Sequence, residues 1–494
     1  MTVPHRPDGD SLKSRTHDAL GDSFLRNAVR FTADRLRDRK HDSSSVLGDW
    51  EQWRTQARDI RNHTIAHLDY YLNVFTDQAS KNGTKVHFAS DAQEARKIFL
   101  DIVRSKSARM VAKSKSMVSE EIHINAALEA ENIECVETDL GEWIVQLAHE
   151  TPSHIIIPAI HKNRYQVQDL FEKESGETLS SETTVLAGYA RRALRAKFEQ
   201  AEIGMTGCNF AIAETGSIVT FSNEGNARMV STLPKTHIVM MGMERIIPSY
   251  NELEVMANVL PRSATGQKTT VYVSAVTGPR RESELDGPDE LHVIILDNGR
   301  SKILEDPEFR EVLNCIRCGA CLNVCPVYRQ IGGHAYGSVY SGPIGAVITP
   351  LLNPGSEKSS ELPFASSLCG ACHEACPVKI PLHDMLVHLR RKHVKAGRSS
   401  LGERAAYAGF GVMSQSSKVF DQAGKAGRWI QLNMIGNSLN SSAGNNAVDT
   451  LVRRTPVYGW TKYRDLPKAP ALSFRDLWKR GKGGQNEGKR EERE

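Results

Sequence analysis

Seven of the nine cysteines in this 494-residue chain lie between Cys315 and Cys376. Four of them form the run Cys315-Ile-Arg-Cys-Gly-Ala-Cys-Leu-Asn-Val-Cys325, which Pro326 follows. Three thiolates at three-residue intervals can wrap one cubane, while a fourth cysteine before proline turns away to serve another cluster. A structural zinc site takes two separated cysteine pairs and has no use for four closely spaced thiolates. The run therefore predicts iron–sulfur ligation.

A second, shorter run reads Cys369-Gly-Ala-Cys-His-Glu-Ala-Cys376 and is also followed by proline. Aligned on its Cys-Pro pair, this run has Ser366 where the first run has its first cysteine. The crossover rule of two-cluster ferredoxins then assigns ligands from both runs to each [4Fe-4S] cluster. Cluster one takes Cys315, Cys318, Cys321 and Cys376; cluster two takes Cys325, Cys369 and Cys372. Cluster two lacks a fourth thiolate, so Ser366, His373, a water or a partner's residue completes it, or it loses one iron and becomes [3Fe-4S].

Two cubanes in one small domain move one electron at a time and can exchange electrons with each other. The function expected from the residues is electron conduction. The alternative is a cluster that only stabilises a fold, as in some nucleic-acid enzymes. The chain has 63 Lys and Arg against 59 Asp and Glu, interspersed, so it lacks the basic surface that binds nucleic acid.

We expect a cytoplasmic protein. The first residues are polar and charged, and no later stretch approaches the roughly 18 apolar residues that span a bilayer. A reducing compartment keeps thiols free, which favours a metal site over disulfides. Cys135 and Cys208 lie outside the runs without a base beside them in the sequence, and we assign them no role.

Before the cysteines, hydrophobic periodicity predicts N-terminal helices and then an α/β domain. Two helices are expected over residues 11–78, separated by a break at 42–45. Strands are expected at 85–89, 109–112, 133–137, 154–159, 237–243, 270–276 and 291–297, with two more around a glycine turn in 209–222. Helices are expected at 91–105, 120–131, 140–150, 164–173 and 182–202. Strands alternating with helices predict a mainly parallel sheet.

The domains predicted from these patterns are N-terminal helices (1–60), the α/β domain (61–305), a helical ferredoxin-type domain with two clusters (306–395), a C-terminal region (396–480) and a tail (481–494). The segment 436–446 is rich in Ser, Gly and Asn. The tail has no apolar residues to order it, and we expect it to be disordered.

The α/β domain shows no dinucleotide-binding or phosphate-binding glycine motif that would hold a hydride acceptor. Two polar loops at strand ends are candidates for ligand binding. One contains Lys113, Ser114, Lys115, Ser116, Ser119 and Glu120; the other contains Glu214, Thr215 and Gly216. The equally weighted alternative is that both are turns with capping residues.

The sequence resembles the lactate-utilisation protein B family. The resemblance rests on residues 113–117, on the turn at 213–218, on both cysteine runs, on residues 333–345 between them, and on the segment 473–478. It implies an iron–sulfur subunit of the bacterial flavin-independent L-lactate oxidation system, working with a cysteine-rich companion and a companion that has only the α/β domain. It also implies an α/β fold shared with sugar-phosphate isomerases and CoA transferases, and a three-cysteine second run as the family pattern.

The function expected is an electron relay in the oxidation of L-lactate to pyruvate, with peripheral contact to the electron-transport chain. We expect the chain not to be catalytic alone, since no hydride-accepting site is visible. Two alternatives stay open: an iron–sulfur subunit of another 2-hydroxyacid, glycerol-phosphate or disulfide oxidoreductase, and a ligand-binding protein whose clusters sense redox state.

Overall fold

The computed structural model describes residues 11–435, 469–479 and 481. The chain divides into two compact units, Met1–Lys395 and Ala396–Glu494. The predicted segment 436–446 and nearly all of the tail 481–494 lie outside the described residues. No helix in the described part is long and apolar enough to span a bilayer.

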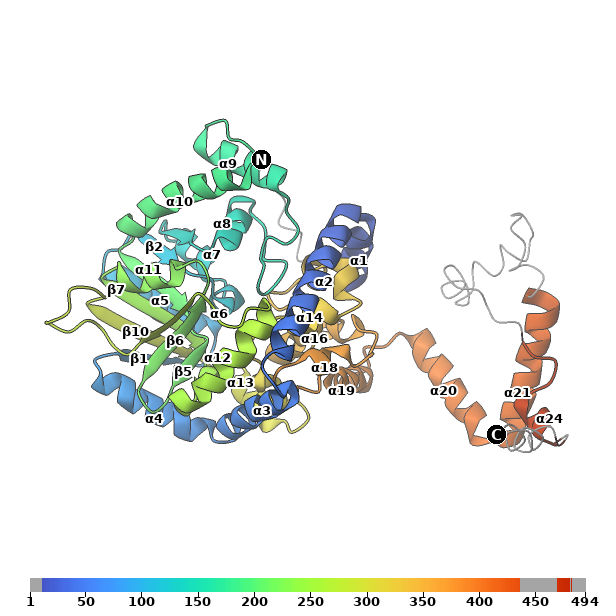
Figure 1. Cartoon of the computed structure of the whole chain (residues 1–494). Helices are drawn as coiled ribbons and strands as arrows, with labels where there is room; N and C mark the ends of the chain where they lie inside the picture. The colour runs from blue at the N-terminus through green and yellow to red at the C-terminus, as the bar shows by residue number, and fades with distance from the viewer. Residues whose placement is uncertain (1–10, 436–468, 480, 482–494) are drawn as a thin grey trace. The chain divides into compact units, whose positions relative to one another are not determined.

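Four N-terminal helices, not the two predicted, open the first unit (Figure 1). They are α1 (Leu12–Gly21), α2 (Ser23–Ser45), α3 (Trp50–Ala66) and α4 (Leu68–Lys81). The break predicted at 42–45 is wrong, because the hydroxyls of Ser43, Ser44 and Ser45 donate to backbone carbonyls three residues earlier and the helix continues. The chain turns instead at Gly48, and Asp49 caps the start of α3 by accepting from two backbone N–H groups.

Six parallel strands form the main sheet in the order β1-β10-β7-β4-β2-β3. Their bounds are β1 (Lys85–Ala89), β2 (Met110–Lys113), β3 (Glu134–Glu137), β4 (Ile203–Gly207), β7 (Thr236–Gly242) and β10 (Glu290–Leu296). The central strand β7 is buried on both faces: Ile238 and Met240 pack on one side with Phe99 of α5 (Ala92–Ser105), while Val239 and Met241 pack on the other with Phe75 of α4. The predicted parallel α/β architecture is confirmed.

A second sheet, which the sequence did not predict as a separate layer, has the order β8-β5-β6-β9. It consists of β5 (Phe210–Ile212), β6 (Ser217–Ser222), β8 (Ile246–Ile247) and β9 (Tyr272–Val276). β5 and β6 form the expected antiparallel pair around Gly216. The second sheet packs with α4 against the face of the main sheet that carries Val239 and Met241.

The helices of the α/β region are α5 (Ala92–Ser105), α6 (Met117–Glu121), α7 (Ile124–Glu129), α8 (Leu140–Leu147), α9 (Arg164–Ser175), α10 (Thr183–Gln200), α11 (Asn226–Thr232), α12 (Tyr250–Ala264) and α13 (Arg300–Glu305), with the short 3-10 turn η1 (Met243–Arg245). The single helix predicted at 120–131 is instead the pair α6 and α7. His123, between them, has φ +54° and interrupts the helix.

The strand predicted at 154–159 is a loop in the structure. His154 is fully buried, and its ring Nδ1 accepts from the backbone N–H groups of Ile156 and Ile157 at 3.0 and 3.2 Å. These local bonds fold the backbone into a turn, and Pro158 follows them. An apolar run of strand length is therefore used here as a buried loop.

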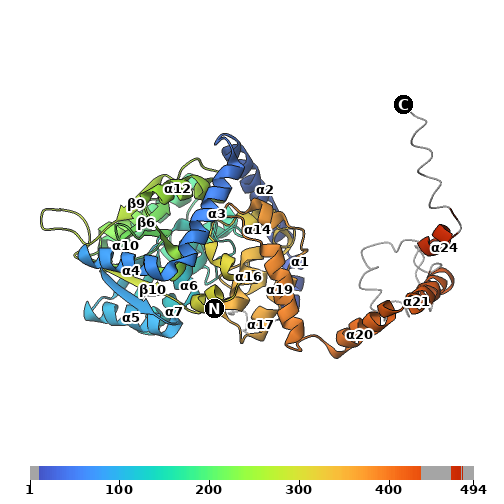
Figure 2. The ribbon, with the colours of Figure 1, turned by 90° about the horizontal axis from the view of Figure 1, so that it is seen from below.

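The cysteine-rich segment is helical, as predicted. It contains η2 (Arg310–Asn314), α14 (Ala320–Val324), α15 (Tyr328–Ile331), η3 (His334–Tyr336), α16 (Gly342–Leu352), α17 (Glu357–Ser360), η4 (Leu362–Phe364), α18 (Ala371–Ala375) and α19 (Leu382–Lys395). α1 and α2 pack beside α14 and α15, although some 300 residues separate them in the sequence (Figure 2). The N-terminal helices are thus part of the surroundings of the cysteines.

The described part of the second unit contains α20 (Leu401–Gln415), α21 (Ser417–Ile430), the π-helical turn η5 (Gln431–Ile435) and α24 (Phe474–Lys479). Ser400 caps α20 and Ser416 caps α21, each by accepting from a backbone N–H three residues later. The Arg475 guanidinium lies over the Phe420 ring, 5.6 Å from its centroid, which joins α24 to α21.

Replacing Gly204 with alanine should destabilise the sheet. A Cβ on Gly204 of β4 would lie 1.9 Å from the backbone carbonyl oxygen of Val230, so α11 would have to move. Overpacking of this kind costs about 1–3 kcal/mol, and the thermal unfolding midpoint followed by circular dichroism should fall. Gly188→Ala in α10 is the control, because its Cβ would meet only the Arg192 guanidinium, at 3.8 Å. Unchanged unfolding of Gly204→Ala would contradict this packing.

Candidate functional site

Four cysteines from both runs line one small cavity: Cys315, Cys318, Cys321 and Cys376. The last three are buried, and the rest of the lining is largely apolar, including Ile155 and Ile344. Burial and the neighbouring thiol of Cys376 raise the pKa of Cys318 to about 12. Without a metal cation to replace its proton, a thiol in these surroundings stays neutral.

The other three cysteines of the runs form a second group. Burial and the nearby thiols of Cys325 and Cys369 raise the pKa of Cys372 to about 12. Cys325 and Cys372 are buried, while Cys369 is exposed. The two groups combine residues from both runs in the way that the crossover spacing predicts. Iron ligation by these residues stays a prediction.

The loops that carry the two runs repeat one backbone conformation. Arg317 and Leu368, each directly before a cysteine, have φ +59° and +56°. Gly319 and Gly370, each directly after that cysteine, have φ +72° and +80°, and a five-residue helix follows in both cases, α14 and α18. Left-handed conformations are uncommon outside glycine. The repeated backbone conformation therefore supports the alignment of the two cysteine runs, independently of their side chains.

In the second loop, Ser366 holds the position that Cys315 holds in the first loop, three residues before the next cysteine of its run. The Arg317 backbone N–H donates to the Cys315 Sγ at 3.4 Å, and the Leu368 backbone N–H donates to the Ser366 Oγ at 3.1 Å. The Ser366 hydroxyl therefore accepts the same local hydrogen bond in the second loop that the Cys315 sulfur accepts in the first. His373, the other candidate in this chain, has its Nδ1 bonded to the Ile380 carbonyl oxygen at 3.1 Å.

The N-terminal helices hold the second cysteine run by its backbone. Arg54 of α3 donates to the carbonyl oxygens of Cys376 at 2.9 Å and His373 at 3.0 Å. Lys40 of α2 donates to the Ala375 carbonyl oxygen. These bonds fix the end of α18, where Cys376 leaves its own run and joins the first group.

The donor set fits iron–sulfur clusters. Within the residues that the structure describes, no three His, Cys, Asp or Glu side chains converge closely enough to share a single metal ion. A cubane does not require such convergence, because each thiolate binds a different iron. Groups of four and three thiols, mostly buried, with backbone N–H groups aimed at Cys315, Cys325 and Cys376, suit a cluster better than one zinc ion.

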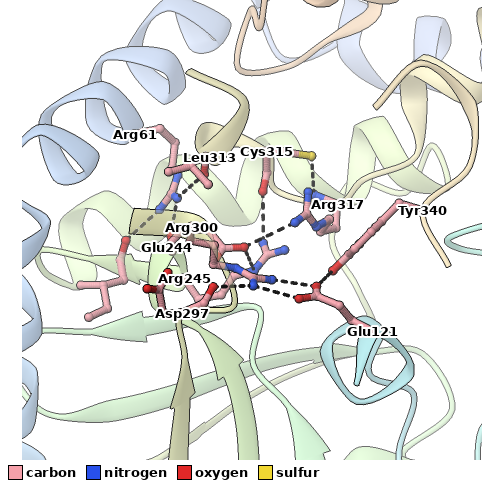
Figure 3. A network of polar contacts seen from close by, with 11 residues as sticks. Arg61, Glu121, Glu244, Arg245, Asp297, Arg300, Leu313, Cys315, Arg317 and Tyr340 are labelled. Atoms are coloured by element: carbon pink, nitrogen blue, oxygen red, sulfur yellow. Dashed lines mark hydrogen bonds and ion pairs between the residues drawn. The ribbon is translucent and has the colours of Figure 1, made fainter. Parts of the chain in front are cut away.

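A buried carboxylate joins the α/β domain to the first cysteine loop (Figure 3). Glu244, in η1 after β7, accepts from Arg300 at 2.7 Å and from Arg317 at 3.4 Å, and Arg245 Nε lies 3.7 Å from it. Burial alone would raise the pKa of Glu244, but these three guanidinium groups hold it at about 2. The carboxylate is therefore ionised at all physiological pH values.

The same network reaches α3, α6 and the cysteine backbone. Arg61 of α3 is fully buried and donates to the Leu313 carbonyl at 3.1 Å, just before Cys315. Arg245 donates to the Cys315 carbonyl at 3.3 Å. Arg300 also binds both carboxylate oxygens of Glu121, at 2.8 and 2.9 Å. Positive charge is thus concentrated next to the first cysteine group.

A larger cavity, of about 330 Å³, lies at the carboxyl ends of the parallel strands. The residues that follow β2, β3, β4 and β7 line it, together with β6, α12, the loop at 155–157 and Arg317 from the cysteine loop. Ile155 and Arg317 line both this pocket and the cavity of the first cysteine group. Ligands of open parallel sheets bind at this edge.

The two candidate loops have different positions. Ser114, Lys115 and Ser116 line the pocket. Lys113 does not; it is fully buried and paired with Glu120 and Glu137. Ser119 stabilises the start of α6 through its backbone N–H and hydroxyl, both bonded to Ser116.

The turn at residues 214–216 does not contribute to the pocket lining. Its Gly216 packs so closely on α4 that a Cβ would lie 2.3 Å from the Ala79 backbone nitrogen, and Asn82 donates to the Thr215 carbonyl at 2.9 Å. The turn has a packing role in the structure. Of the two other cysteines, Cys208 lines the pocket, with a pKa raised by burial to about 12, and Cys135 is buried near Asn125.

Sequence reasoning missed the arginine and glutamate residues of the network. The signal for Glu244 and Arg245 was a charged pair directly after the buried run that forms β7. The signal for Arg317 was its place inside the first cysteine run. Nothing in the sequence linked either position to Arg300 or Glu121, because the partners lie on separate elements.

Two family models match the α/β domain and the cysteine-rich segment. Residues 72–296 match the LUD domain family, and residues 311–380 match the 4Fe-4S dicluster domain family. A solved structure of a DUF162 family protein from Deinococcus radiodurans aligns with 46% of this chain and 98% of its own, at 17% identity and a TM-score of 0.27.

Curated relatives match almost the whole chain. Lactate utilization protein B of Macrococcus caseolyticus is 49% identical, covering 94% of this chain and 96% of that protein. Lactate utilization protein B of Bacillus subtilis is 47% identical, covering 94% and 95%. With this identity over nearly its full length, and with both domains in place, the chain belongs to the lactate utilization protein B family.

Proposed function

We propose that this iron–sulfur protein of lactate utilisation relays electrons during the oxidation of L-lactate to pyruvate. The observation that carries the proposal is the grouping of the cysteines into a set of four and a set of three across the two runs. Cys315, Cys318, Cys321 and Cys376 would hold one [4Fe-4S] cluster, and Cys325, Cys369 and Cys372 the other. When bound, each cluster supplies a centre that gains and loses one electron.

The surrounding residues suit this role. The guanidinium groups of Arg61, Arg245 and Arg317 lie near Cys315, where they would attract the negative charge of a bound cluster. Apolar side chains such as Ile155 and Ile344 limit water access to the first set, whereas Cys369 leaves the second set open to solvent. The exposed side offers a route for electrons to a partner.

The proposal includes the partners that the resemblance implies: a cysteine-rich companion and a companion that has only the α/β domain. It also includes a cytoplasmic location, where thiols remain reduced, and peripheral contact with the electron-transport chain.

The chain alone should not form pyruvate from L-lactate, because no hydride-accepting motif is present in its sequence. The complex with both companions, mixed anaerobically with L-lactate, should bleach the cluster absorbance and release pyruvate. Dithionite reduction of the chain alone is the control that its clusters are functional. Pyruvate formation by the isolated chain with an artificial acceptor would contradict the relay assignment.

Cys376→Ser should damage the same EPR signal as Cys318→Ser, since both belong to the first set, although 58 positions separate them in the sequence. Cys325→Ser should match Cys369→Ser instead. Each variant should lose about half of the bound iron if one of two clusters is lost. Cys135→Ser is the matched control and should change neither signal. The crossover assignment would be refuted if Cys325→Ser damaged the same signal as Cys318→Ser, and Cys376→Ser the same signal as Cys369→Ser.

The second cluster should lose iron first when oxidant is added. With three cysteines, its fourth iron would depend on a weaker oxygen or nitrogen ligand, such as Ser366, or on a partner's side chain, and cluster stability follows ligation and exposure. Stepwise oxidation should give a three-iron EPR signal while the first cluster persists. Ser366→Cys should suppress that signal, whereas Ser367→Cys, one residue away, should not. Equal resistance of both clusters in the native chain would show that a strong fourth ligand is already present.

A further inference from the structure

The pocket of about 330 Å³ is lined by two basic side chains, Lys115 and Arg317, that keep buried N–H donors without a hydrogen-bond acceptor among the described residues. Lys115 Nζ has no hydrogen-bond partner among the described residues, and it forms a long ion pair with Glu142 Oε1 at 3.6 Å. Arg317 is 8% exposed, and its guanidinium lies over the Tyr340 ring, 4.6 Å from the centroid. Its Nε and Nη1 have no hydrogen-bond partner among the described residues. Buried donors left unpaired are costly. Two cationic side chains that line one pocket and keep free donors indicate an anionic ligand.

The acidic residues of the pocket do not neutralise these donors by hydrogen bonds. Asp139 accepts from the Glu142 backbone N–H at 3.1 Å and caps α8, and Glu224 accepts from the Leu140 backbone N–H at 3.0 Å. Burial raises the pKa of Glu142 to about 8, which reduces its negative charge beside Lys115 at neutral pH. Lys115 and Arg317 therefore remain available for a ligand.

The rest of the lining suits a small organic acid with a polar substituent. Ser114, Ser116 and Asn226 offer hydroxyl and amide groups, whereas Ile156, Met240 and other apolar side chains offer contact for a short alkyl group. The volume is at the lower end of the range for small-molecule sites, about 300–1,000 Å³.

We infer that this pocket binds a small 2-hydroxy or 2-oxo carboxylate, with Lys115 and Arg317 as its carboxylate-binding residues. The inference rests on the proposed function for its substrate class. Its position follows from the structure: Arg317 lies between Cys315 and Cys318 and lines both the pocket and the first cysteine cavity. A ligand there would be one residue away from the first cysteine set. The α/β domain would thus hold the organic acid next to the electron relay.

Binding can be measured apart from electron transfer. The full chain with its clusters reconstituted is titrated anaerobically with L-lactate, pyruvate and inorganic phosphate by calorimetry. We expect saturable binding of one L-lactate or pyruvate per chain. Lys115→Gln and Arg317→Gln should each weaken it by about tenfold or more, the value of one charged hydrogen bond. Lys115→Arg, which keeps the charge, should retain most of the affinity.

Lys85→Gln is the matched control, because Lys85 is the first residue of β1, at the amino end of the strand and away from the pocket, and pairs with Glu290. It should leave binding unchanged. Cluster absorbance and EPR of Lys115→Gln should equal those of the parent chain, which shows that the variant is folded. Wild-type affinity in Lys115→Gln would overturn the assignment, as would the absence of binding by all three probes. If phosphate bound more tightly than either acid, the pocket would be assigned to a phosphorylated ligand, and the assignment to a carboxylate would be overturned.

The two proposals fail separately. Lactate binding that depends on Lys115, in a complex whose clusters are never reduced by lactate, would support the pocket and refute the relay. Cluster reduction by lactate in a complex built with Lys115→Gln, at the rate of the parent complex, would support the relay and refute the pocket.

Discussion

The polar contacts of one buried residue, Glu244, join the α/β domain, the first cysteine loop and helix α3. Its oxygens face guanidinium groups from the sheet edge, from α13 and from the first cysteine loop, and its own carbonyl accepts from Arg61 of α3. Removing one partner of a buried ion pair costs about 3–5 kcal/mol, because the other charge stays buried. The position of the cysteine loop relative to the sheet therefore depends on this residue.

The network is not electrically balanced. Three guanidinium groups, those of Arg245, Arg300 and Arg317, face two carboxylates, Glu121 and Glu244, and a fourth, that of Arg61, donates to backbone carbonyl oxygens (Figure 3). A surplus of buried positive charge is costly unless anions lie nearby. Thiolates on one side and an organic acid on the other would supply them. Under both proposals, the same surplus would be balanced by anions on either side of the network.

Sequence patterns predicted those features that depend on local rules. Parallel strands buried on both faces appear as apolar runs, which is why β7 and β10 were found. β4 was missed because two of its five residues are glycines, and Gly204 is required by the close approach of α11. Cysteine spacing is also a local rule, and the two proposed ligand sets follow from it. The pocket and the arginine network combine side chains from distant elements, which no spacing in the sequence encodes.

The bonds from Lys40 and Arg54 to the second cysteine run have a consequence for how this protein can be divided. In the sequence, the segment with the ferredoxin spacing is a motif of about 70 residues that could be expected to fold by itself. Its second loop, however, is anchored by helices made more than 300 residues earlier. Excised by itself, the segment would lose the groups that hold the end of α18. During synthesis those helices leave the ribosome first, so the anchor exists before the cysteines that it holds, and cluster insertion can follow completion of the chain.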